Sequence, residues 1–174
     1  MILLRQSVPG VTAAMLARFL GRARRAAGLA GEVTVLVASS AELRRLNRRF
    51  RGHDYPTDVL SFPPQPAKPR RDGYLGDIAI SAAIARQNGK LLGHGAAAEI
   101  KVLMLHGLLH LAGYDHERDN GRMARHELRL RRQLNLPLAL TERSVATPSN
   151  KRAASSTVDA RRPRRASVRR SRQR

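Results

Sequence analysis

Apolar residues recur along the chain with two different periods, one typical of helices and one of strands, up to about Leu136. Apolar residues three and four positions apart predict helices, because such residues share one helical face. The predicted helices are Val11–Ala27, Glu42–Phe50, Ala82–Leu91, about Ala96–Ala112 and about Asp119–Leu134. Short runs of β-branched and other apolar residues predict buried strands. The predicted strands are Val33–Ala38, Thr57–Phe62 and Leu75–Ile80.

Residues at the ends of these segments support the same division. Ser39 or Ser40 can cap the helix Glu42–Phe50, and Ser81 can cap the helix after it, because a serine hydroxyl accepts a hydrogen bond from a free backbone N–H. Pro63 closes the second strand, since proline has no N–H to donate. The order of elements predicts an α+β fold, with a small mixed four-stranded sheet packed by about five helices.

The apolar periodicity ends near Pro137, and Ser, Thr, Arg, Ala and Pro dominate from Ser144 onward. We predict one folded domain over residues 1–137 and a basic, disordered tail over residues 138–174. Residues 143–174 hold 11 Lys or Arg and one acidic residue. Half of the net charge of +20 therefore lies in residues 1–142.

A charge of this size favours an anionic polymer as partner, because each phosphate that a protein neutralises releases counterions. A cell that uses arginine freely would explain the charge without such a partner. The chain has no apolar run near the ~20 residues that span a bilayer, and no secretory signal, so we expect a cytoplasmic protein without a membrane partner. Cysteine is absent, so any metal site must use His, Asp or Glu.

Three histidines within eleven residues form the most informative pattern in the chain, LMLHGLLHLAGYDHERD. His106 and His110 are four positions apart on a predicted helix, so both side chains lie on one face and can reach one ion. Gly113 permits the chain to turn back and bring His116 to the same ion. Three histidines leave one position open for water, which is typical of a catalytic Zn²⁺ site. We predict one such ion per chain.

The same pattern overlaps the metzincin protease signature H-E-x-x-H-x-x-G-x-x-H. In that signature the residue after the first histidine is the glutamate that acts as general base, and here it is Gly107. A glycine cannot transfer a proton. The pattern therefore still predicts a metal site but disfavours protease activity.

The segment HGLLHLAGYDH closely resembles the signature of the YbeY family of bacterial metal-dependent endoribonucleases. LNRRFRGHDYPTDVLSF at 46–62 and YLGDIAIS at 74–81 resemble two further family motifs in the same order. The resemblance covers roughly residues 2–136. It implies a zincin-like fold, one zinc ion on the three histidines, and cleavage of single-stranded RNA. It also implies a role at the ribosome, in maturation of the 16S rRNA 3′ end and in ribosome quality control; no DNA partner is expected.

The resemblance assigns a catalytic role to Arg51, whose guanidinium can bind a phosphodiester and stabilise the charge of the transition state. Asp77 and Asp115 can each orient a ligand imidazole or merely bond within a turn. The polar residues of the second strand can line a cleft or make hydrogen bonds at the strand end. These residues are Thr57, Asp58 and Ser61. We predict no metal ligand among the remaining histidines, which are His53, His94 and His126.

Two other functions share the predicted metal site. One is a non-catalytic, zinc-containing ribosome assembly factor, and the other is a zincin-type metalloprotease without its glutamate. The Arg-rich tail is outside the usual extent of the family. It is either a dispensable solvated extension or an electrostatic arm that holds ribosomal RNA near the site.

Overall fold

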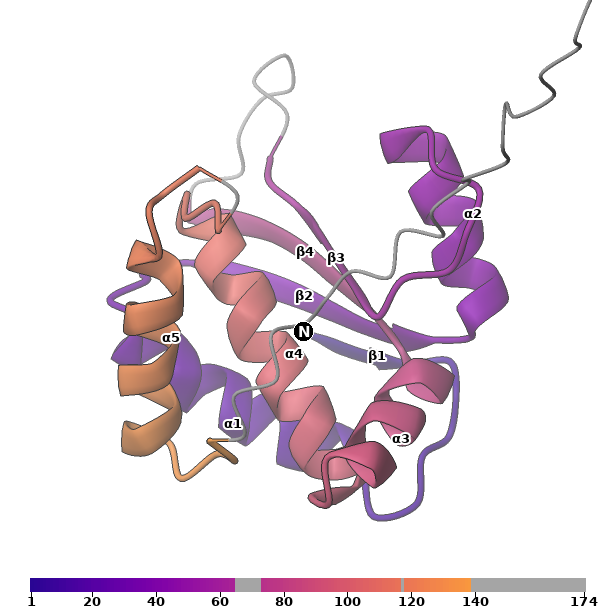
Figure 1. Cartoon of the computed structure of the whole chain (residues 1–174), viewed down its shortest axis with the longest axis horizontal. Coiled ribbons are helices and arrows are strands. Elements are labelled where there is room, and N and C mark those ends of the chain that lie inside the picture. The colour runs from indigo at the N-terminus through magenta and orange to yellow at the C-terminus, as the bar shows by residue number, and fades with distance from the viewer. Residues whose placement is uncertain (65–72, 117, 139–174) are drawn as a thin grey trace, which may run out of the picture. The chain divides into compact units, whose positions relative to one another are not determined.

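A mixed four-stranded sheet organises the computed structural model, which describes residues 1–64, 73–116 and 118–138 (Figure 1). The strands are β1 (Ile2–Leu4), β2 (Glu32–Ala38), β3 (Val59–Phe62) and β4 (Tyr74–Ser81). Their order is β1-β2-β4-β3, with β1, β2 and β4 parallel and β3 antiparallel to β4. The antiparallel strand β3 is therefore at one edge of the described sheet.

Five helices in the described residues cover the two faces of this sheet. They are α1 (Ala13–Ala26), α2 (Ser40–Arg51), α3 (Ala82–Leu91), α4 (Gly95–Leu111) and α5 (Arg122–Gln133). Alternate residues of β2 point to opposite faces: Val35 packs with α1, α4 and α5, whereas Ala38 packs with α2. The predicted α+β fold, with a mixed four-stranded sheet and five helices, is confirmed.

Helix α4 is the centre of the larger core. Residues on nearly all its sides are buried, from Glu99 to Leu109, because sheet, α1, α3 and α5 surround it. A helix that is apolar all round is a buried helix. Truncating one of its leucines, such as Leu103 with no exposed surface, would cost about 2–5 kcal/mol of unfolding free energy. The helix is thus a rigid support for the side chains at its end.

Serine side chains cap the N-terminal ends of α2 and α3, as the sequence predicted. The hydroxyls of Ser39 and Ser81 accept hydrogen bonds from the backbone N–H groups of Glu42 (3.2 Å) and Ile84 (3.3 Å). Ser39, rather than Ser40, is the cap of α2. Ser40 instead shares a hydrogen bond of 2.8 Å with Ser81, which joins the N-terminal ends of α2 and α3.

Several predicted elements differ from the structure in their bounds by one to three residues, and one strand was not predicted. Strand β1 was not predicted, because its three residues carry no alternation and pair with β2 only through tertiary structure. Helix α5 begins at Arg122, three residues late, because Asn120 (φ 53°) and Gly121 (φ 76°) are in the left-handed region. Strand β3 begins at Val59 rather than Thr57, where the Asp58 carboxylate accepts the Val59 N–H at 2.8 Å.

The predicted tail, residues 138–174, lies outside the described residues apart from Leu138. Most of the Pro-rich loop after β3, residues 65–72, is outside them too. Within the described part of the chain, no helix is long and apolar enough to cross a membrane.

Candidate metal centre

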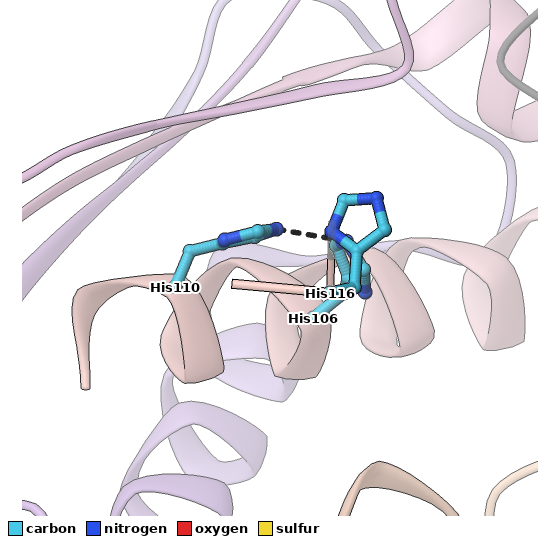
Figure 2. Close-up of side chains that lie close together, drawn as sticks. All are labelled: His106, His110 and His116. Carbon is cyan, nitrogen blue, oxygen red and sulfur yellow. Dashed lines mark hydrogen bonds between the residues drawn. The ribbon is translucent and has the colours of Figure 1, made fainter. Parts of the chain in front are cut away.

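The three predicted ligands meet at the C-terminal end of α4. His106 and His110 lie one turn apart on the helix, and His116 follows in the next loop (Figure 2). The ligand nitrogens of all three lie within 4.8 Å of one another. The ring centroids are 4.8 to 5.5 Å apart, and the rings stand edge to face. The structure therefore brings together the three histidines that the spacing selected.

A Schellman turn at the end of α4 returns the chain toward the helix. The N–H of Tyr114 donates to the carbonyl of Leu109 (3.1 Å), and that of Gly113 donates to the carbonyl of His110 (3.0 Å). Gly113 has φ 88°, a conformation that side chains disfavour. This turn satisfies the last carbonyls of α4 and brings His116 over the helix end.

Hydrogen bonds to the protein fix which nitrogen of each helical histidine carries a proton. His110 Nδ1 lies 3.1 Å from the carbonyl oxygen of Tyr114, which can only accept, so Nδ1 donates. His106 Nδ1 lies 2.9 Å from a carboxylate oxygen of Glu127 on α5. In their neutral forms both rings then present an unprotonated Nε2, the form that binds metals.

The two Nε2 atoms point at each other across 3.1 Å. Two lone pairs at this separation repel unless a proton or cation lies between them. Nitrogens bound tetrahedrally to one zinc at about 2.0–2.1 Å are themselves about 3.3–3.4 Å apart. The donor set therefore fits a metal ion with little movement. His116 is exposed, so the third corner of the site is open to solvent.

Glu127 was not singled out by the sequence, because it is 21 residues from His106 and in another helix. Arg131 holds its other oxygen, with the guanidinium nitrogens 2.9 and 2.5 Å away. Burial raises the pKa of Glu127, but the hydrogen bond from His106 and the charges of His106 and Arg131 outweigh it and lower the pKa to about 2. Glu127 is thus an ionised acceptor for His106.

Burial and the two neighbouring histidines favour the neutral form of His110. Burial is the largest cause that lowers its pKa to about 4, from 6.5 in the free side chain, and the charges of His106 and His116 act in the same direction. The bond to Tyr114 opposes them. The charge of Arg51 has a smaller effect in the same direction as those of His106 and His116.

Arg51 is the last residue of α2 and is exposed, and Gly52 in the left-handed conformation ends the helix after it. Gly107, the position of the missing glutamate, faces the sheet. A Cβ there would lie 2.8 Å from a methyl carbon of Ile78 and 3.1 Å from the hydroxyl of Ser61. A glutamate would not fit without moving α4 away from β3 and β4.

Among the other predicted polar residues, Ser61 bonds the backbone of α4, whereas Thr57, Asp58, Asp77 and Asp115 have partners close to them in the sequence. Ser61 donates to the Gly107 carbonyl (3.2 Å), and Thr57 donates to Asp58 (3.3 Å). Asp77 accepts a hydrogen bond from the Tyr74 hydroxyl, and Asp115 lies 3.8 Å from Arg118. Among the described contacts, Glu127 is the carboxylate that bonds a histidine of the cluster.

The remaining histidines lie elsewhere. His94 pairs with Glu99 at 2.7 Å, His53 stacks on Tyr55, and His126 stacks on Tyr114. In the described residues, the group with metal-ligand geometry is that of His106, His110 and His116.

Comparisons with known proteins identify the family of this chain. Residues 7–135 match the family model described as Endoribonuclease YbeY. The Endoribonuclease YbeY of Koribacter versatilis is 53% identical over 145 residues, which cover 83% of this chain and 92% of that protein. That of Solibacter usitatus is 48% identical over 126 residues, 72% of this chain and 82% of that protein.

A solved structure supports the same relationship at the level of the fold. The solution structure of TM1509 from Thermotoga maritima is 30% identical, with a TM-score of 0.50. The match covers 77% of this chain and 89% of that one. The chain therefore belongs to the YbeY family of endoribonucleases, which are hydrolases that cut RNA.

Proposed function

We propose that this chain is a zinc-dependent endoribonuclease specific for single-stranded RNA, and that it acts in 16S rRNA 3′-end maturation and ribosome quality control. The observation that carries the proposal is the meeting of His106, His110 and His116, whose ligand nitrogens lie within 4.8 Å of one another, in a chain of this family. The net charge of +20 supports a polyanionic substrate. The cytoplasm, where ribosomes assemble, is the expected location.

His106, His110 and His116 are the proposed zinc ligands. When bound, a zinc ion lowers the pKa of a coordinated water to about 7 and thereby supplies a nucleophile at neutral pH. Glu127 holds His106 in the tautomer that binds metal, and the Tyr114 carbonyl does the same for His110. Arg131 keeps Glu127 in place.

Arg51 is the proposed catalytic residue. Its guanidinium binds the scissile phosphate, because five N–H donors in a plane match two phosphate oxygens. The positive charge stabilises the extra negative charge of the transition state. Its electrostatic effect on His110 supports a position beside the ligands.

Gly107 argues against the protease alternative. Zincin proteases need a carboxylate at this position, and here the close approach to Ile78 excludes one. The assembly-factor alternative shares the metal site but predicts no cleavage.

The experiment that tests the proposal compares a labelled single-stranded RNA with its duplex, using protein stripped of metal and then given one equivalent of zinc. We expect cleavage only of the single strand and only with zinc. The same protein is then added to immature small ribosomal subunits, with the 3′ end of the 16S rRNA mapped by primer ligation. Stoichiometric zinc without cleavage of any RNA would favour the assembly factor.

A further inference from the structure

Aromatic side chains are rare in this protein, and three of the six lie outside its hydrophobic clusters. The chain has three Phe, three Tyr and no Trp. Phe19 is the buried one, with 5% of its surface exposed. The other five are half-buried or exposed. They are Phe50, Tyr55, Phe62, Tyr74 and Tyr114. Because a small core gains most from buried aromatic rings, the exposure of Phe50 outside both hydrophobic clusters points to another use.

Four of these rings, those of Phe50, Phe62, Tyr74 and Tyr114, lie near the ends of β3 and α4. Tyr114 holds His110 through its carbonyl. Phe62 is the last residue of β3 and pairs in register with Asp77, whose carboxylate bonds the Tyr74 hydroxyl. A Cβ on Gly76 would lie 2.9 Å from a methyl carbon of Leu111 and closer still to the Phe62 carbonyl. The end of β3 thus adjoins the end of α4, where the ligands are.

Phe50 is the most exposed of these rings. It lies in the last turn of α2 with 51% of its surface accessible, and its ring meets that of Phe62 edge to face at 5.1 Å. This contact brings the C-terminal end of α2 to the same side as the ends of β3 and α4 (Figure 1). Arg51 follows Phe50 and is the last residue of α2.

The ring is set among positive charges. The Arg49 guanidinium carbon lies 5.4 Å from the centre of the Phe50 ring. Arg44 and Arg48 are paired with Asp54, whereas no ion pair with a described residue engages Arg45, Arg49 or Arg51. An exposed ring beside unpaired arginines is the arrangement by which proteins hold single-stranded nucleic acid, with bases on rings and phosphates on guanidinium groups.

We propose that Phe50 and Arg49 form a base-stacking subsite, in which one unpaired base next to the scissile phosphate stacks on the Phe50 ring. This inference rests on the proposed nuclease function and adds to it a physical basis for the choice of single strands. A base within a duplex is already stacked on both faces and cannot reach the ring, whereas an unpaired base can. Phe50 is a positioning residue, because it acts on the base and not on the reacting phosphate.

The test uses Phe50→Leu, which keeps an apolar contact with Phe62 but removes the ring, and Phe50→Tyr, which restores the ring. Leu91→Ala is the matched control. Leu91 is 75% exposed at the end of α3, and the loop after it joins the other end of α4. The substrates are a short unstructured oligoribonucleotide and a series with a single abasic residue moved along it. Cleavage is followed as kcat/KM, and binding without metal by fluorescence anisotropy.

We expect Phe50→Leu to lower kcat/KM by roughly 5- to 100-fold, the range for one stacked base. Phe50→Tyr and Leu91→Ala should stay near the wild type. One abasic position should slow the wild type by a similar factor but cause little further loss in Phe50→Leu, because the two changes remove the same contact. Independent losses at every position, or full activity of Phe50→Leu, would overturn the subsite.

Failure of the nuclease proposal would look different. The wild type would then cleave no RNA even with zinc, and the metal-free binding data would decide the subsite alone. Weaker binding by Phe50→Leu, with no further effect of one abasic position, would still support it. Equal binding by Phe50→Leu and the wild type would refute it. Unchanged thermal unfolding of Phe50→Leu serves as the check that α2 remains packed.

Discussion

The two ends of helix α4 each carry a histidine bonded to a glutamate, but the two pairs are used differently. At the N-terminal end, His94 bonds Glu99 through Nε2 at 2.7 Å, and the Glu99 side chain is completely buried. At the C-terminal end, His106 bonds Glu127 through Nδ1 at 2.9 Å and keeps Nε2 toward His110. The two ends are about 25 Å apart along a helix of 17 residues.

The nitrogen that is committed to the protein decides what each histidine can do. His94 forms its hydrogen bond to Glu99 through Nε2, its outer nitrogen, and its Nδ1 is buried without a hydrogen-bond partner. It is closed to any ligand and links the loop before α4 to the helix. His106 and His110 form their hydrogen bonds to Glu127 and Tyr114 through Nδ1, and their Nε2 atoms face each other beside His116. In this protein, a histidine–glutamate pair belongs to a candidate metal site only where the other ring nitrogen faces a second imidazole.

Removing one histidine from each end of α4 should have the largest and most different effects. We expect His110→Ala to lose bound zinc and to lower RNA cleavage by roughly 1000-fold or more, because the ion supplies the nucleophile. His94→Gln should retain zinc and cleavage and change only the unfolding temperature. Metal content by mass spectrometry and single-turnover cleavage measure both. Equal zinc loss in the two variants would contradict the distinction.

Replacing Arg51 tests whether the open end also binds the phosphate. Arg51→Ala should lower kcat by about 100- to 1000-fold, the usual cost of one transition-state donor, with zinc content unchanged. Arg45→Ala is a control in the same helix that removes the same charge. If the two variants lost the same activity, the effect would be general electrostatic attraction and not a contact at the reacting phosphate.

The two glutamates provide a sharper test of smaller size. Glu127→Gln should weaken zinc affinity by about 10- to 100-fold, because the amide no longer draws the Nδ1 proton of His106 as a carboxylate does. Glu99→Gln should leave zinc affinity unchanged and cost about 1–3 kcal/mol of unfolding free energy. Competition with a zinc chelator and urea unfolding separate the two effects. A shift in zinc affinity for Glu99→Gln would mean that the ends of α4 are coupled.

The smallest expected effect is on the pH dependence of stability without metal. The pKa of His110 is lowered from 6.5 to about 4 in the folded protein, so the unfolded chain binds more protons between these values. Stability should therefore fall as the pH falls from 6.5 to 4, and His110→Gln should flatten this dependence. Because the ring is only half-buried, solvent reduces the effect, and we expect a loss of a few degrees in Tm, about 2–4 °C. Thermal unfolding at several pH values measures it; an equal slope in the variant would refute it.

Local sequence patterns predicted the periodic elements and the cluster of candidate ligands. His106 and His110 share a face because the helix has a fixed period, and Gly113 permits the turn that brings His116 back. Ser81 and the run Ala82–Leu91 define a helix whose bounds agree with the structure. Such features depend on interactions between residues that are close in the chain, so a local pattern contains the information.

The orientation of the three histidines and their surroundings depend on tertiary packing. Glu127 bonds His106 because α5 packs on α4, and a sequence separation of 21 residues hides this contact. Strand β1 exists because β2 offers it an edge, and Phe50 meets Phe62 because α2 covers the opposite face of the sheet. These contacts join residues that no period relates, and their free energy comes from packing that forms only when the whole domain folds.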